Sequence, residues 1–201
     1  VIGFVGESGS GKTTLLDLIM GLLSPTDGNI KFNKINLQQY ISKWNSIISY
    51  MPQEGLLMDA TLAANIALEY DADNIDINLI QESIDFAQLN KFVDSSALGM
   101  NALIGEHGSA VSGGQRQRIL LARTFYNKRN VLVMDEATRG LDEKTEHEVV
   151  EEIKRLKGSR TIIIVAHKIS TLRFCDLIYE VKEGNVLKGV TYADFITSHK
   201  H

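Results

Sequence analysis

The 201-residue sequence is poor in three residue types, with one cysteine, two prolines and one tryptophan. Cys175 has no partner for an internal disulfide, which is consistent with a reducing compartment. So few prolines, and the lack of any low-complexity tract, argue against a disordered or proline-rich chain. No apolar run approaches the about 20 residues that cross a bilayer. The most apolar segment, residues 161–166, is a short β-branched run typical of a buried strand.

Composition and charge favour an ordinary globular protein. Apolar residues make up 44% of the chain and charged residues 23%, and the formal net charge is −4. An acidic balance argues against a surface built for nucleic acid, because phosphate binding uses clustered Lys and Arg. The charged run at residues 143–157 is typical of a solvated helix face. The length suits one domain, or one domain with a sizeable insert.

Hydrophobic periodicity predicts alternating strands and helices. Buried strands are expected at residues 1–5, 131–134 and 161–165, and shorter ones at 30–32 and 47–51. Helices are expected at residues 12–23, 79–93 and 115–126, and from an N-cap at Asp142 to 156. Glu183-Gly184 predicts a hairpin turn between residues 177–181 and 185–187. This order predicts an α/β fold with a mostly parallel sheet flanked by helices, and an inserted helical subdomain at residues 61–125.

The first 14 residues contain a phosphate-binding motif between a strand and a helix. Residues 6–13 read GESGSGKT, which fits G-x-x-x-x-G-K-[ST]. Small residues let backbone N–H groups close around phosphate oxygens, Lys12 reaches the β- and γ-phosphates, and the Thr13 hydroxyl binds Mg²⁺. The predicted nucleotide-binding residues are Gly6, Ser8, Gly9, Ser10, Gly11, Lys12, Thr13 and Thr14. Kinases, GTPases and motor ATPases share this loop, so alone it predicts only a nucleotide.

A second chemical motif is the acidic end of the strand at residues 131–134. Asp135 and Glu136 follow it directly. A parallel strand beside the phosphate-loop strand would bring Asp135 near Mg²⁺. Glu136, one residue later, would then polarise the attacking water as general base.

Residues 111–118 read VSGGQRQR, and Ser112 lies 23 residues before Asp135. Here the chain resembles the ABC ATPase family, whose signature reads LSGGQ. Small residues that open a helix form a second anion site. The resemblance implies a P-loop NTPase fold with a RecA-like core at residues 1–60 and 126–201. It also implies that Ser112, Gly113, Gly114 and Gln115 contact the ATP held by a second ABC ATPase domain.

The resemblance covers nearly the whole chain. It implies that Gln53 matches the Q-loop, touching Mg²⁺ and water, and that Asp142 matches the dimer-contacting D-loop. His167 matches the γ-phosphate contact of the H-loop. Residues 105–108 (GEHG) and 166–171 (AHKIST) look like the exporter forms GERG and AHRLST. By resemblance, Glu106 would contact the coupling helices of a transmembrane domain.

The expected function is therefore ATP hydrolysis, with Mg²⁺, that powers an ABC exporter from the cytoplasmic face of a membrane through ATP-driven dimerisation. Three positions depart from the family pattern: Arg139 and Gly140 replace Ser and Ala, and His107 replaces Arg. The aromatic residue that stacks on adenine would lie before residue 1, so material upstream of the first strand is expected.

Three other functions share parts of this pattern. A soluble ABC ATPase acting on DNA or ribosomes would carry coiled-coil inserts, zinc cysteines or a second ATPase domain. A regulatory subunit that binds ATP without cleaving it is disfavoured by Glu136 and His167, while Arg139 and Gly140 leave room for it. A small-molecule kinase would not explain residues 112–115.

Overall fold

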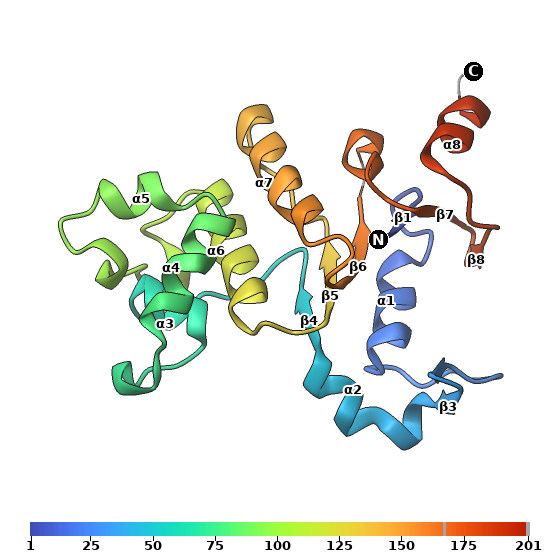
Figure 1. Cartoon of the computed structure of the whole chain (residues 1–201), viewed down its shortest axis with the longest axis horizontal. Helices are drawn as coiled ribbons and strands as arrows, with labels where there is room; N and C mark the ends of the chain where they lie inside the picture. Colours follow the sequence, from blue (N-terminus) through green and yellow to red (C-terminus); the bar gives the residue numbers. More distant parts are fainter. Residues whose placement is uncertain (167, 200–201) are drawn as a thin grey trace. The chain divides into compact units, whose positions relative to one another are not determined.

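The computed structural model describes residues 1–166 and 168–199 (Figure 1), with the His107 side chain excepted. The chain forms two compact units. Unit 1 comprises Val1–Tyr50, Arg129–Glu136 and the residues from Gly158 onward, and unit 2 comprises Met51–Lys128 and Ala137–Lys157.

A six-stranded sheet forms the centre of unit 1. Its strands are β1 (Ile2–Val5), β4 (Ile48–Met51), β5 (Val131–Asp135), β6 (Thr161–Val165), β7 (Leu177–Lys182) and β8 (Asn185–Val186). The strand order is β4-β5-β6-β1-β7-β8. β1 runs parallel to β6 and β7, β5 runs parallel to β6, and β8 pairs antiparallel with β7. All five residues of β5 are buried, as a strand covered on both faces requires. The prediction of a mostly parallel α/β sheet is confirmed.

Helices and a small hairpin complete unit 1. The helices are α1 (Lys12–Met20), α2 (Ile41–Ile47) and α8 (Tyr192–Ser198), with 3-10 turns η1 (Leu37–Tyr40) and η5 (Ile169–Leu172). The hairpin joins β2 (Lys31–Phe32) to β3 (Ile35–Asn36). The predicted helix 12–23 ends three residues early because Gly21 takes a left-handed conformation with φ 76°.

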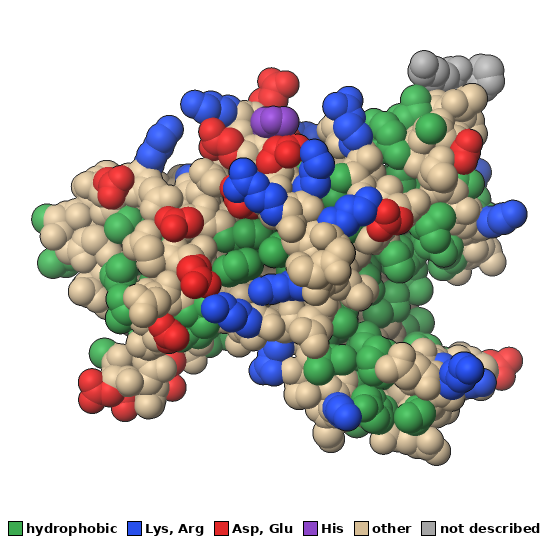
Figure 2. Space-filling view, in the orientation of Figure 1, with side chains coloured by type: hydrophobic (Ala, Val, Ile, Leu, Met, Phe, Trp, Pro, Cys, Tyr) green, Lys and Arg blue, Asp and Glu red, His purple; other side chains and the backbone are tan. Residues whose placement is uncertain are grey.

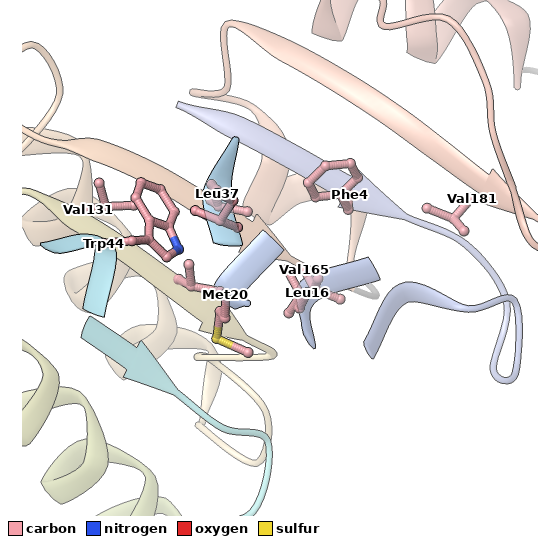
Figure 3. Close-up of a cluster of buried hydrophobic side chains, with 10 residues drawn as sticks. Phe4, Leu16, Met20, Leu37, Trp44, Val131, Val165 and Val181 are labelled. Atoms are coloured by element: carbon pink, nitrogen blue, oxygen red, sulfur yellow. The ribbon is translucent and has the colours of Figure 1, made fainter. Parts of the chain in front are cut away.

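One apolar cluster joins α1, α2 and the sheet (Figure 3). Leu16 and Met20 of α1 pack with Trp44 of α2 and with inward residues of β1, β5 and β6. The Trp44 indole N–H donates to the Ile19 carbonyl oxygen over 3.0 Å, so the ring fills the core without an unpaired polar atom. This packing holds the helix that follows the phosphate loop against the sheet.

Unit 2 is helical. It contains α3 (Leu62–Ala67), α4 (Ile77–Phe86), α5 (Asn90–Asp94), α6 (Gly113–Tyr126) and α7 (Glu143–Arg155), with 3-10 turns η2 (Ala72–Asn74), η3 (Gly99–Asn101) and η4 (Glu106–Gly108). α6 packs against α3 and α4, and Ile66, Ile84 and Ile119 are fully buried. The predicted helix 79–93 is interrupted, because Gln88 is left-handed with φ 55° and separates α4 from α5.

The exposed face of α7 carries charges of both signs (Figure 2). Lys154 pairs with Glu151 over 3.2 Å, and both side chains are about half exposed. The predicted solvated helix face at this charged run is confirmed. Among the helices of residues 1–166 and 168–199, none is long and apolar enough to span a bilayer.

Candidate nucleotide site

The phosphate loop connects the end of β1 to the start of α1 in unit 1. Gly9 and Gly11 have φ of 78° and 105°, a conformation that residues with a Cβ avoid. Gly11 is the N-cap of α1 and has no side chain to occupy the first-turn N–H groups. These donors and the helix dipole therefore favour an anion at this end of α1.

Lys12 lies over the loop. Its side chain is 7% exposed, and its Nζ donates to the carbonyl oxygens of Gly6 and Glu7 over 2.9 and 2.7 Å. Thr13 and Thr14 are exposed at the start of α1. The Ser10 Oγ is buried with no hydrogen-bond partner among the described residues. The Lys12 ammonium group, the Thr13 and Thr14 hydroxyls and the uncapped N–H groups fit the phosphates of a nucleotide.

Asp135 and Glu136 lie at the same end of the sheet as the loop. Phe4 of β1 and Asp135 of β5 both pair in register with Val165 of β6. The expectation that β5 lies beside β1 is wrong, because β6 is inserted between them. Two strand spacings separate β1 from β5, about 10 Å, and the shared register still puts both strand ends at one level.

The two carboxylates are held differently. Asp135 ends β5 and is 3% exposed, and Glu136 is 8% exposed. Glu136 takes a left-handed backbone with φ 54°, and its N–H donates to the Val165 carbonyl oxygen over 3.0 Å. Such a conformation is uncommon for a residue with a side chain, and it clusters at functional positions.

The residues of unit 1 fit a magnesium ion. The Thr13 hydroxyl and the Asp135 carboxylate are hard oxygen donors of the kind that Mg²⁺ prefers. Within the described part of the chain, no group of three or more His, Cys, Asp or Glu side chains could hold a metal. An ion at this place would therefore take few protein ligands and complete its shell with phosphate and water, which is usual for nucleotide-bound Mg²⁺.

Tyr50 of β4 lies within electrostatic range of Asp135. Burial, and then the negative charges of Asp135 and Asp17, raise the pKa of Tyr50 to about 12. The phenol therefore stays neutral at physiological pH and can act only as a neutral hydrogen-bonding group beside the acidic strand end.

The signature segment opens α6 in unit 2. The Ser112 Oγ accepts the Gln115 N–H over 3.2 Å, and the Gln115 Oε1 accepts the Ser112 N–H over 2.7 Å. This reciprocal capping box fixes the first turn of the helix. Ser112 and Gly113 are exposed, and a Cβ on Gly113 would meet no atom within 4 Å. The segment is therefore a preformed helix start with open space at its second residue.

The segment before α7 lies against this helix start. A Cβ on Gly114 would stand 3.3 Å from the Gly140 carbonyl oxygen. Asp142 caps α7 by accepting the Thr145 N–H over 3.1 Å. Hydrogen bonds with the Thr145 side chain and then with its N–H, and last the positive charge of Arg118, lower the pKa of Asp142. Arg118 itself donates to the Gln88 carbonyl oxygen over 2.7 Å. The predicted N-cap is confirmed, and unit 2 thus places residues 112–115 and Asp142 on adjoining helix starts.

The remaining predicted site residues are distributed as follows. Gln53 follows β4 in unit 2 and is partly exposed, and Glu106 begins η4 and is exposed. His167 lies outside the described residues. The structure thus brings the loop, Asp135 and Glu136 together in unit 1, and the signature segment, Gln53, Asp142 and Glu106 belong to unit 2.

Two residues in contact with the phosphate loop were not expected from the sequence. A Cβ on Gly6 would clash with the Val181 carbonyl oxygen, and the Gly184 N–H donates to the Ser10 carbonyl oxygen over 3.0 Å. Glu183-Gly184 was expected only as a hairpin turn, and backbone contacts of this kind leave no signal in a sequence.

Comparison with known proteins identifies the family of the chain. A sequence model of the family described as "ABC transporter" matches residues 1–139. Over 97% of the chain, it is 35% identical to "ABC transporter B family member 21" of Arabidopsis thaliana. Over 98% of the chain, it is 34% identical to an "ATP-dependent lipid A-core flippase" of Ralstonia nicotianae.

The fold is also similar to that of a solved structure described as a bacterial Atm1-family ABC exporter with ATP bound. The TM-score is 0.91 and the sequence identity 26%, over 98% of this chain and 35% of that chain. The chain spans 15% and 33% of the lengths of the two curated relatives. The chain thus belongs to the ABC transporter family, as an ATP-binding ATPase domain related to those of exporters.

Proposed function

We propose that this chain hydrolyses ATP at the phosphate loop and that hydrolysis powers an exporter whose membrane-spanning part lies outside these 201 residues. The observation that carries the proposal is the common level of the loop and the acidic strand end, since Phe4 and Asp135 share one register position on β6. Cargo would be moved by the membrane part, with this chain at its cytoplasmic face.

Different residues of the chain bind the phosphates, hold Mg²⁺ and accept a proton. The Gly11 to Thr14 backbone N–H groups bind phosphate oxygens, and Lys12 exchanges its two carbonyl partners for the β- and γ-phosphates. Thr13 and Asp135 would hold Mg²⁺, which supplies neutralising charge for the phosphates when bound. Glu136 accepts the proton of the attacking water, since its carboxylate sits one residue beyond Asp135.

The remaining roles concern residues of unit 2 and His167. We assign Gln53 to the attacking water and Mg²⁺, and His167 to the γ-phosphate. The exposed start of α6, residues 112–115, would face the nucleotide of a second ABC ATPase domain, with Asp142 at the same interface. Helices α3 to α6 support a signature subdomain at residues 61–125, set into a core of 1–60 and 126–201. Unit 2 is larger than this subdomain, since it also takes in residues 51–60, 126–128 and Ala137–Lys157.

Contact with the membrane part is assigned to Glu106 and its surroundings. Glu106 is exposed, and in the same unit Leu56 and Leu103 are 78% and 65% exposed. Where large exposed apolar side chains gather into one patch, they mark a surface that binds another protein segment.

The first test compares ATP hydrolysis by the chain and by its Glu136→Gln variant across a range of protein concentration. Glu151→Gln serves as a matched control, because Glu151 forms only an exposed surface pair. We expect Mg²⁺-dependent activity that rises faster than linearly with concentration, unchanged in Glu151→Gln. Glu136→Gln should bind ATP and lose turnover by about 100-fold or more. ATP binding without turnover in the parent chain would favour a non-hydrolysing subunit.

The second test addresses the dimer. Lys12→Ala removes the phosphate lysine, and Ser112→Arg blocks the signature segment. In a head-to-tail dimer, mixing the two variants creates one intact site from Lys12 of one chain and Ser112 of the other. Each variant alone should therefore be inactive, and the mixture should regain activity. A mixture as inactive as its components would contradict the shared site.

A further inference from the structure

The β7–β8 hairpin reaches beyond the end of β1 and runs beside the phosphate loop. The last paired residues of β1 and β7 are Val5 and Glu180, but β7 continues to Lys182. The residues that follow Val5 are the loop itself, so the extension of β7 and its turn lie along the loop rather than along a strand. The close approach of Gly6 to the Val181 carbonyl oxygen is the first contact of this extension.

The turn of this hairpin has a defined geometry. β7 ends at Lys182 and β8 begins at Asn185, so Glu183 and Gly184 are its two central residues. Their φ values are 50° and 76°. Positive φ at both central residues is the signature of a type I′ turn, which favours glycine at the second of them. The two central residues lie outside the ladder, so the Gly184 N–H is available to an acceptor elsewhere.

That acceptor is the phosphate loop. The Gly184 N–H donates to the Ser10 carbonyl oxygen over 3.0 Å, and a Cβ on Gly11 would stand 3.7 Å from the Gly184 Cα. The Ser10 carbonyl and the Gly11 N–H belong to one planar trans peptide unit, in which they point in opposite directions. Fixing the Ser10 oxygen toward the hairpin therefore turns the Gly11 N–H to the opposite side of the peptide, away from the hairpin.

We propose that the β7–β8 turn positions the phosphate loop for the nucleotide, with Gly184 as a positioning residue that holds the Ser10–Gly11 peptide so that the Gly11 N–H faces the phosphates. This inference rests on the proposed function of the loop. The loop's N–H groups bind phosphate only if they converge, and a peptide free to rotate would present the Ser10 carbonyl oxygen to the anion instead.

The structure offers a matched control for a test by mutation. The β2–β3 hairpin of unit 1 also has a two-residue turn, Asn33-Lys34, with φ of 49° and 69°. Among the described residues, Lys34 makes no hydrogen bond to the loop. Proline at position 184 or 34 removes an N–H and cannot adopt the positive φ of either turn, but only Gly184→Pro removes the bond to Ser10.

The measurement is the affinity for ADP with Mg²⁺, which cannot be hydrolysed at a γ-phosphate, in Gly184→Pro, Lys34→Pro and Lys12→Ala. We expect Kd to rise about tenfold in Gly184→Pro, which corresponds to about 1.4 kcal/mol, and to stay within about twofold of the parent in Lys34→Pro. Equal Kd in the two proline variants would overturn the positioning role. Unchanged Kd in Lys12→Ala would instead overturn the proposed function of the loop.

A second measurement uses the parent chain alone. It tests the positioning role of Gly184 even if Gly184→Pro does not fold. Coupling between two sites is reciprocal. If the Gly184 hydrogen bond lowers the Kd for ADP tenfold, bound ADP must favour formation of that hydrogen bond by the same factor. Amide hydrogen exchange of the parent chain should therefore slow about tenfold at Gly184 on saturation with ADP, and not at Lys34. Exchange at Gly184 that ADP leaves unchanged would refute the proposal.

Discussion

Replacing Asn65 by Ala should be among the most damaging single changes in unit 2. The Asn65 side chain is fully buried on α3. Its Oδ1 accepts the Met58 N–H over 2.8 Å, and its Nδ2 donates to the carbonyl oxygens of Met58 and Thr61 over 3.0 Å each. The Arg123 guanidinium also donates to the Oδ1 over 3.4 Å. One amide thus satisfies the backbone of the segment that precedes α3.

The loss of unfolding free energy can be worked out from the groups whose hydrogen-bond partner is the Asn65 side chain. Asn65→Ala leaves the Met58 N–H and one Arg123 N–H without it, whereas the Met58 carbonyl oxygen keeps the Ala60 N–H as a donor over 2.9 Å. At about 1 kcal/mol for each of these two orphaned groups, the loss of unfolding free energy should be about 2 kcal/mol. Burial already lowers the pKa of Arg123, because desolvation disfavours its charged form. A further unpaired N–H on the same guanidinium adds to that cost.

The assay is urea unfolding followed by far-UV circular dichroism, with Asn127→Ala as the matched control. Asn127 is exposed, and its side chain makes one hydrogen bond, to the Arg123 carbonyl oxygen over 3.1 Å. Its replacement should cost less than about 0.5 kcal/mol, as usual for surface positions. If Asn65→Ala cost no more than Asn127→Ala, the argument from buried unpaired groups would be refuted.

Three further predictions concern the surroundings of the proposed site. Thr138→Val should cost about 1–2 kcal/mol in the same unfolding assay, because the Thr138 hydroxyl donates to the buried Glu146 carboxylate over 3.0 Å; a stabilised variant would contradict this. Asp142→Ala should lower the urea concentration at the midpoint of unfolding through the lost N-cap, and Asp142→Asn should restore most of that midpoint. Burial and the nearby carboxylates raise the pKa of Tyr50 to about 12, so the folded chain binds this proton more tightly than the unfolded chain does. Unfolding free energy should therefore fall as pH rises from about 10 to about 12, and a Tyr50→Phe variant with the same fall would refute the assignment.

The strongly patterned elements could be predicted from the sequence. The buried runs at β1, β5 and β6 and the Asp142 cap were found within a residue, since β-branched runs and capping residues act locally. Family membership followed from the order of the phosphate loop, the signature segment and the acidic strand end. That order does not depend on where each helix or strand is predicted to begin or end. The Glu183-Gly184 turn was also predicted, because a left-handed glycine leaves a local signal.

The rest depends on contacts that a sequence does not display. The position of β6 between β1 and β5 is a property of the crossover connections, and the apolar pattern of each strand is compatible with either order. The break at Gln88 interrupts an otherwise helical pattern, and its carbonyl oxygen is bonded by Arg118, thirty residues away. Asn65 has no neighbouring residue that would reveal its buried partners. Long-range hydrogen bonds of this kind determine the conformation of the loops, and the loops contribute many residues of the site.

The position of Lys12 also has a practical consequence for handling the protein. Amine-reactive dyes and activated sensor surfaces modify the lysines that they can reach, and the Lys12 Nζ is shielded and occupied by two carbonyl oxygens. Lys34, Lys43 and Lys154 are exposed. Lysine coupling should therefore immobilise the chain through its surface and leave the phosphate loop chemically intact, so that nucleotide binding can be followed directly on a sensor chip.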